Sequence, residues 1–167
     1  MKIGLMKKSL IVLVALFVSG FVSGQEVKKV KITDLEKTIA ESRTPLIVSF
    51  WATFCLPCIQ EIPYFQEEVK KHRKDSVQLI LVSLDLPDYY PAKIKSFATK
   101  HNFTVPIVWL DETNADYFCP KVDPKWSGAI PATLFVNNAT GYRKFFEEQL
   151  SADQFKKEIM AILPGKD

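Results

Sequence analysis

The sequence contains only three cysteines and two histidines among its 167 residues, and it has no internal repeat, low-complexity tract or Gly/Ser linker. Three cysteines are too few to hold a fold together by disulfides, so at least one of them is expected to be present for its chemistry. The composition, with 47% hydrophobic, 25% charged and 12% aromatic residues, excludes a disordered chain and a collagen-like repeat. A chain of this length fits a single globular domain.

The chain also lacks a surplus of either charge once its first 24 residues are set aside. Residues 1–24 contain three lysines and no acidic residue. Removing these three from the 22 Lys and Arg residues leaves 19, which equals the number of Asp and Glu residues. A neutral chain has no basic surplus for the phosphate backbone of nucleic acid, so we expect no nucleic-acid partner.

No hydrophobic run is long enough to cross a membrane, but the N-terminus has the three parts of a secretory signal peptide. A basic stretch precedes an apolar run from Leu10 to Val22 at most, and small residues follow at 22–24. This run has at most 13 residues, whereas a bilayer core needs about 20. We therefore expect residues 1–24 to be a signal peptide and residues 25–167 to form one domain, with an uncleaved membrane anchor as the alternative. Export implies a periplasmic or cell-envelope location, where cysteine pairs form disulfides.

The remaining chain alternates predicted strands and helices, which indicates an α/β fold with antiparallel strands at the end of its sheet. Apolar runs and alternation predict strands at 27–32, 46–51, 77–82, 105–110, 132–136 and 142–148, the first of them at a sheet edge. Helical spacing predicts helices at 33–42, 55–71, 91–101 and 151–163, and Thr33 with Glu36 fits a capping box at the start of the first. Residues 111–130 have no clear periodicity and are expected to form a long loop, a length that indicates either a function or a missed element.

The motif Cys55-Leu56-Pro57-Cys58 lies between the strand at 46–51 and a helix. This position puts Cys55 at a helix N-terminus, where unpaired amides and the helix dipole stabilise a thiolate. A low pKa makes Cys55 the attacking sulfur and a good leaving group, and Cys58, one turn further on, would resolve the mixed disulfide. Pro57 fits the first turn, where its missing N–H has no helical partner to lose. The context therefore predicts a redox pair.

Metal binding is the rival chemistry for these cysteines. A zinc site needs two further ligands at consistent spacing, and only Cys119, His72 and His101 could supply them, each placed singly. A copper-handling protein would use the CxxC pair with a third soft ligand such as Cys119. Met160 is the only methionine beyond residue 24, and no histidine is close in sequence to the CxxC motif, so we expect no metal site.

Two segments resemble those of a known superfamily. Residues 49–58, SFWATFCLPC, resemble the active-site segment of the thioredoxin superfamily, and residues 128–133, GAIPAT, resemble its cis-proline segment ahead of a strand. The resemblance implies a thioredoxin-like fold, in which a central mixed β-sheet is flanked by helices. It also implies that the bond between Ile130 and Pro131 is cis and that this segment lies beside the CxxC motif.

The same resemblance implies a surface for an extended partner chain. Pro131 and the preceding Ile130 would offer backbone groups to that chain, and we count Pro57 and Trp51 as further candidate substrate-binding residues. The alternative for Trp51 is a position in the core, although in the family an aromatic residue nearby helps to shield the disulfide.

The segment 58–63, CIQEIP, resembles exported thioredoxin-like proteins of the ResA/TlpA type, in which a glutamate three positions after the second cysteine lies near the disulfide. The 73 residues from the second cysteine to Pro131 leave room for the inserted strand-helix unit of such proteins. Glu61 is thus a candidate for proton transfer, because partial burial would raise its pKa towards the working range; the alternative is a surface glutamate. Ser49, where cytoplasmic thioredoxins have a buried Asp, and Phe54, where a Trp is usual, depart from the family pattern.

The resulting hypothesis is an exported thiol-disulfide oxidoreductase that reduces disulfides of exported proteins, with apocytochrome c thiols as the use that the resemblance implies. Its partners would be protein disulfides and a membrane electron donor, and the membrane itself only if the N-terminal segment is uncleaved. Disulfide exchange requires no bound cofactor.

A thiol peroxidase of the same fold is a second rival, although the single reactive cysteine with a Thr and an Arg that it requires is not visible around Cys55. Cys119 is either a thiol packed beside Tyr117 and Phe118 or an accessory redox thiol.

Overall fold

The computed structural model describes residues 26–165, and the expected signal segment at 1–24 lies outside the described residues. The strands are β1 (Val27–Val30), β2 (Leu46–Trp51), β3 (Gln78–Ser83), β4 (Ile107–Leu110), β5 (Ala132–Asn137) and β6 (Tyr142–Phe146). The α-helices are α2 (Ile32–Glu41), α3 (Leu56–Lys71), α4 (Ala92–Lys100), α5 (Ala115–Val122) and α6 (Ala152–Ile162), with short 3₁₀ turns η1 (Arg73–Asp75) and η2 (Pro87–Tyr89). Within this part of the chain, no helix has the length and hydropathy needed to span a bilayer.

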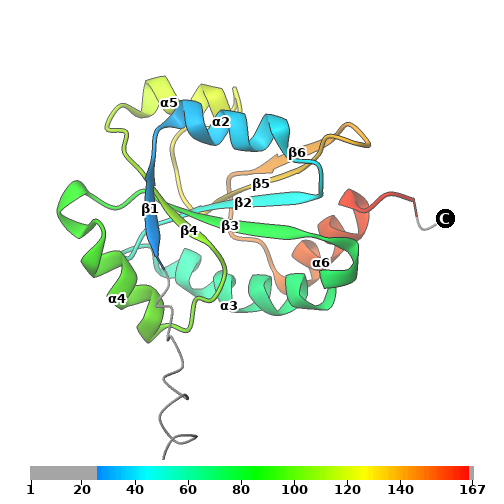
Figure 1. Ribbon diagram of the computed structural model, residues 1–167, viewed down its shortest axis with the longest axis horizontal. Helices are drawn as coiled ribbons and strands as arrows, with labels where there is room; N and C mark the ends of the chain where they lie inside the picture. Colours follow the sequence, from blue (N-terminus) through cyan, green and yellow to red (C-terminus); the bar gives the residue numbers. More distant parts are fainter. Residues whose placement is uncertain (1–25, 166–167) are drawn as a thin grey trace, which may run out of the picture.

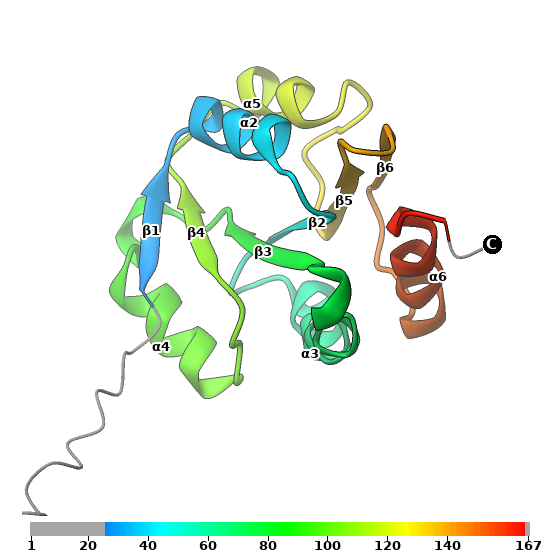
Figure 2. The ribbon, with the colours of Figure 1, turned by 45° about the vertical axis from the view of Figure 1, so that its right-hand side comes forward.

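The sheet is mixed, as the sequence predicted. Its strand order is β1-β4-β3-β2-β5-β6, in which the first four strands run parallel, β5 is antiparallel to β2, and β6 is antiparallel to β5. Helices α2 and α5 cover one face of the sheet, and α3, α4 and α6 cover the other (Figures 1 and 2). The predicted edge position of β1 is confirmed. The carboxyl ends of β2 and β3 lie side by side, because Trp51 pairs with Ser83.

The central strand β2 is buried along its whole length because helices cover both faces of the sheet. Its side chains alternate between the two sides. Ile47 and Trp51 belong to the hydrophobic cluster under α3, and Val48 and Phe50 belong to the cluster under α2. Each large apolar side chain of this kind contributes roughly 1.5–3 kcal/mol on burial. The strand therefore gives a well-anchored base to the segment that follows it.

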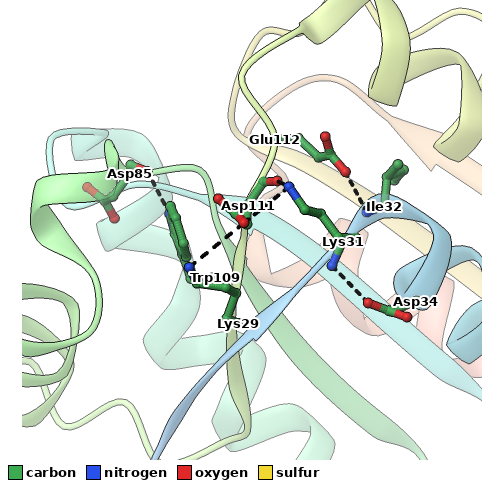
Figure 3. A network of polar contacts seen from close by, with 8 residues as sticks. All are labelled: Lys29, Lys31, Ile32, Asp34, Asp85, Trp109, Asp111 and Glu112. Carbon is green, nitrogen blue, oxygen red and sulfur yellow. Dashed lines mark hydrogen bonds and ion pairs between the residues drawn. The ribbon is translucent and has the colours of Figure 1, made fainter.

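The start of α2 differs from the prediction. The sequence predicts a capping box at Thr33, but the helix begins at Ile32 with Lys31 as its N-cap residue. The Asp34 carboxylate accepts the Lys31 N–H at 3.0 Å, and Glu112, just after β4, accepts the Ile32 N–H at 3.1 Å (Figure 3). A carboxylate from a distant segment thus satisfies a free amide of the first turn, which the local sequence does not reveal.

The region 111–130, predicted to be a loop, contains helix α5. Its buried side consists of Phe118, Cys119 and Val122, whereas Pro120 is exposed. A helix of two turns with an internal proline offers too few repeats for its period to be recognised. The predicted extra strand-helix unit is confirmed, because β3, α4, β4 and α5 all lie between α3 and the cis-proline segment.

Candidate active site

The CxxC motif occupies the turn from β2 into α3. Cys55 is the N-cap residue of α3, and its N–H donates to the Ala52 carbonyl at 3.0 Å. Cys55 and Cys58 form a disulfide, and the Cys58 N–H donates to the Cys55 sulfur over 3.4 Å. Cys55 is 6% exposed and Cys58 is 0% exposed. The cysteine expected to attack is therefore the more accessible of the two, and it lies at a helix N-terminus where an amide N–H stabilises a thiolate.

A buried carboxylate that the sequence analysis missed fixes this turn. Asp85, just after β3, is 4% exposed. Its carboxylate accepts the Thr53 N–H at 3.0 Å, the Thr53 hydroxyl at 2.6 Å and the Ser83 hydroxyl at 2.8 Å. Its backbone carbonyl accepts the indole N–H of Trp109 on β4 at 2.8 Å (Figure 3). An Asp directly after a buried strand that neighbours the motif's own strand is the sequence signal that could have identified it.

Glu61 lies one turn after Cys58 on α3 and is 1% exposed. Its Oε2 atom accepts the Leu150 N–H at 3.0 Å, whereas Oε1 has no hydrogen-bond partner among the described residues. Burial raises the pKa of Glu61 to about 8, and the Leu150 hydrogen bond opposes part of this rise. The surface alternative for Glu61 is therefore excluded, and the carboxyl group can exchange a proton near neutral pH.

Ser49 stands at the position where cytoplasmic thioredoxins have a buried Asp, and its surroundings contain a second hydroxyl. It pairs with Thr133 across β2 and β5, and both hydroxyls are buried without a hydrogen-bond partner in the described part of the chain. Ser49 shares its face of the strand with Trp51, in the cluster that also contains Cys58. On this side of the sheet, β2 and β5 each supply a hydroxyl group, and the carboxyl group comes from Glu61 on α3.

The peptide bond between Ile130 and Pro131 is cis, as the resemblance implied. The loop before it is held by Glu147, just after β6, whose carboxylate accepts the N–H groups of Ser127 at 2.9 Å and Ala129 at 3.0 Å. The Ser127 hydroxyl also donates to this carboxylate. That hydroxyl and the two N–H groups hold the pKa of Glu147 below its usual range. Glu147 is thus a second supporting residue that the sequence analysis did not identify.

The candidate substrate-binding residues differ in accessibility. Ile130 is half-buried against the cluster that contains both cysteines, and Pro57 is half-buried in the first turn of α3. Trp51, in contrast, is 0% exposed. Its ring packs against those of Phe103 and Phe97, with centroid distances of 5.3 Å and 5.9 Å. This corrects the assignment of Trp51 to the substrate-binding surface, because a fully covered ring cannot contact a docked chain.

Three large apolar side chains are exposed near the motif instead. Phe54 is 71% exposed and Leu56 is 63% exposed, and they flank Cys55 in the sequence. Leu86 is 66% exposed and follows the buried carboxylate that binds the turn. Exposed apolar side chains next to a reactive cysteine are candidates for contact with a partner. The sequence analysis singled out Phe54 only as a departure from the family pattern, because its exposure depends on the tertiary structure.

Cys119 is 2% exposed on α5, and its sulfur lies 3.6 Å from the place that a Cβ atom on Gly128 would occupy. Burial, with additional effects of Glu147 and Asp116, raises the pKa of Cys119 to about 11. A thiol with this pKa stays protonated at neutral pH and is a poor nucleophile. These observations favour a packed thiol over an accessory redox thiol. Among residues 26–165, no group of three or more His, Cys, Asp or Glu side chains could hold a metal ion.

Comparison with known proteins identifies the family. Residues 21–140 match the AhpC/TSA family. The chain belongs to this family. One curated relative is the thiol-disulfide oxidoreductase ResA of Geobacillus thermodenitrificans (strain NG80-2), which is 24% identical over 119 residues that cover 71% of this chain and 63% of the relative. This chain thus spans less than two thirds of that relative's length.

Two solved structures show the fold. The thioredoxin-related protein from Neisseria meningitidis serogroup B has a TM-score of 0.61 and 24% identity, over 72% of this chain and 86% of that one. StoA from Bacillus subtilis has a TM-score of 0.52 and 26% identity, over 71% of this chain and 84% of that one. The thioredoxin-like fold predicted from the two sequence segments is therefore confirmed.

Replacing Asp85 with alanine removes the acceptor for the Thr53 and Ser83 donors. We expect the free energy of unfolding of the oxidised protein to fall by about 2–4 kcal/mol, since each buried donor left without an acceptor costs roughly 1–3 kcal/mol. Urea denaturation followed by circular dichroism measures this loss. Asp88→Ala, at an exposed position of η2, is the matched control and should change the value by less than about 0.5 kcal/mol. Equal losses in the two variants would contradict the anchoring role.

The shifted pKa of Glu61 makes stability depend on pH. Its ordinary pKa is 4.5 and its value in the folded protein is about 8, so between these values the folded state keeps a proton that the unfolded state has released. The free energy of unfolding should therefore fall as the pH rises through this range, by up to about 5 kcal/mol, and level off above it.

Glu61→Gln should remove this part of the pH dependence and be more stable than the wild type at about pH 8. Urea denaturation at about pH 5 and about pH 8 measures the difference between the two proteins. Glu67→Gln, at an exposed position of α3, should keep the wild-type dependence. The burial argument fails if the Glu61→Gln protein loses as much stability between these pH values as the wild type.

Proposed function

We propose that this chain is a thiol-disulfide oxidoreductase that reduces disulfides of exported proteins. The observation that carries the proposal is the Cys55–Cys58 pair at the N-terminus of α3, with the more accessible cysteine at the N-cap position. The cis bond before Pro131 adds the second element that the resemblance requires. The name of the ResA relative, a thiol-disulfide oxidoreductase, supports the same activity.

The proposed reaction consists of two successive thiol-disulfide exchanges. The Cys55 thiolate attacks one sulfur of the partner disulfide; that S–S bond breaks, and the second partner sulfur leaves as a thiolate that takes up a proton. A mixed disulfide now joins Cys55 to the partner. The Cys58 thiol then loses its proton and attacks the Cys55 sulfur, which forms the Cys55–Cys58 disulfide and releases the first partner sulfur. Two electrons have passed to the partner.

Glu61 is the proposed acceptor of the Cys58 proton. It follows Cys58 by one turn on the same helix, and its Oε1 atom is buried without a partner among the described residues. With a pKa of about 8, Glu61 is protonated in most molecules near neutral pH. The ionised fraction, which grows as the pH rises, accepts the Cys58 proton without a large driving force. The hydroxyl of Ser49 cannot take this role, because a serine does not ionise in this pH range.

The partner chain is proposed to bind across the cis-proline segment, where Ile130 and Pro131 offer backbone groups, and beside Pro57 in the first turn of α3. Glu147 supports this arrangement by accepting hydrogen bonds from the N–H groups of Ser127 and Ala129. A loop whose conformation is set before the partner arrives loses less entropy on binding.

Export, a periplasmic or cell-envelope location and a membrane electron donor belong to the same proposal. The pattern of residues 1–24 supports export. An electron donor is required because the oxidised pair cannot begin another cycle, and disulfide exchange needs no bound cofactor. Apocytochrome c thiols are the substrate that the resemblance to ResA/TlpA proteins favours.

The Cys58→Ser variant should trap the intermediate. Once reduced, it should accumulate a mixed disulfide between Cys55 and a protein disulfide such as that of insulin, because the resolving thiol of Cys58 is gone and the remaining thiol, Cys119, is buried. Mass spectrometry detects the adduct. Cys55→Ser should form none, and Cys119→Ser should behave as the wild type does. An adduct at Cys119 would restore its role as an accessory thiol, and rapid peroxide consumption by Cys55 alone would favour the thiol peroxidase instead.

The reduction potential of the Cys55–Cys58 pair gives the direction of electron flow. In glutathione redox buffers we expect a value close to that of thioredoxin, about −270 mV, which fits a reductant. A value near that of strong periplasmic oxidants, about −120 mV, would reverse the proposed direction. If no disulfide forms at any glutathione ratio, the redox proposal fails and copper handling becomes the better hypothesis.

A further inference from the structure

A groove of about 380 Å³ opens beside the CxxC turn, on the side of α4. It is lined by Thr53, by Tyr89 of η2 and by one face of α4 that includes Lys93, Phe97 and Lys100. Residues spaced by three and four positions lie on the same side of a helix. The groove is therefore bounded by a single helix face and by the turn that precedes the attacking cysteine. The exchange reaction proposed above does not use it.

Thr53 connects the groove to the reacting sulfur. It lies two residues before Cys55, so their Cα atoms are no more than about 7 Å apart. Asp85 fixes both the N–H and the hydroxyl of Thr53. Phe54 follows Thr53, Leu86 follows Asp85, and both apolar side chains are exposed. A partner segment attached to Cys55 by a mixed disulfide reaches this groove within a few residues.

The groove has aromatic walls and a positive rim. Tyr89 and Phe97 supply the rings, and the Lys93 Nζ atom lies 4.5 Å from the centroid of the Tyr89 ring. Helix α4 contains three lysines and no acidic residue. Within residues 26–165, neither Lys93 nor Lys100 forms an ion pair, and no acidic side chain lines the groove.

We propose that this groove binds the partner segment next to the attacked cysteine, and that this segment carries an apolar side chain with a carboxylate beside it. The inference rests on the proposed oxidoreductase function. The apolar side chain fills the space between the rings of Tyr89 and Phe97, and the carboxylate pairs with Lys93 or Lys100. Because charges at the rim of an interface act mainly on the rate of association, partners are selected at the encounter, before disulfide exchange.

Two disulfide-bonded peptides of equal length test the proposal. Each has a leucine next to the cysteine, followed by glutamates in one peptide and by lysines in the other. The reduced full-length protein is mixed with each peptide, and chromatography gives the second-order rate constant of reduction. We expect the acidic peptide to react at least about tenfold faster at low salt. The preference should shrink at high salt, because ions screen exposed charges.

Lys93→Glu and Lys100→Glu should each lower the preference for the acidic peptide by about threefold or more, and the double variant should reverse it. Lys95→Glu is the matched control. It makes the same charge change on the same helix, at an exposed position that does not line the groove, and it should leave the preference nearly unchanged. Equal rates for the two peptides in the wild type would overturn the proposal, as would an effect of Lys95→Glu as large as that of Lys93→Glu.

The uncharged 2-hydroxyethyl disulfide separates the groove from the oxidoreductase function. Normal reduction of this compound without any preference between the peptides would reject the groove and leave the function standing. Failure to reduce this compound at all would reject the function itself. Normal reduction together with the expected preference, lost only in the Lys93 and Lys100 variants, would support both.

Discussion

The position of the reacting sulfur depends on a carboxylate that lies outside the strand and helix that carry it. Asp85 binds the N–H and the hydroxyl of Thr53, and its carboxylate is in turn bound by the Ser83 hydroxyl. Because Asp85 is buried, these hydrogen bonds compensate for the loss of water around the carboxylate. Its backbone carbonyl binds Trp109 on the next strand. The ends of β2, β3 and β4 are thereby coupled at the place where Cys55 emerges.

Two other carboxyl groups near the site show how burial and the number of donors decide what a side chain can do. Glu61 is buried with one hydrogen-bond donor, Leu150, and its pKa rises to about 8. Glu147 is half-buried, receives three hydrogen bonds from Ser127 and Ala129, and has a lowered pKa. Glu147 therefore stays charged and holds a backbone loop, whereas Glu61 can take up and release a proton at a cost in stability that grows with pH.

Consecutive residues were sufficient to predict most of the elements, because each strand or helix is encoded locally. The run at 46–51 is a buried strand, and the CxxC motif begins a helix, as expected. Contacts between distant segments could not be predicted in this way. Glu112 sets the start of α2, and Asp85 binds Thr53 from 32 positions away. The burial of Trp51 could not be predicted locally either. The alternation of β2 does not tell whether α4 and the segment after it cover the face of the sheet on which Trp51 lies.

The reaction and the choice of partner draw on different parts of this chain. Both cysteines and Glu61 come from the continuous segment of β2 and α3, so their relative geometry is set by one turn and one helix. The aromatic and basic face of α4 comes from the region between α3 and the cis-proline segment. On the role proposed for the groove, a change on the exposed side of α4 alters how fast a partner arrives, while both cysteines and Glu61 stay in place. The proposal thus places the choice of partner on the face of α4 and the exchange chemistry on the turn and helix that carry the cysteines.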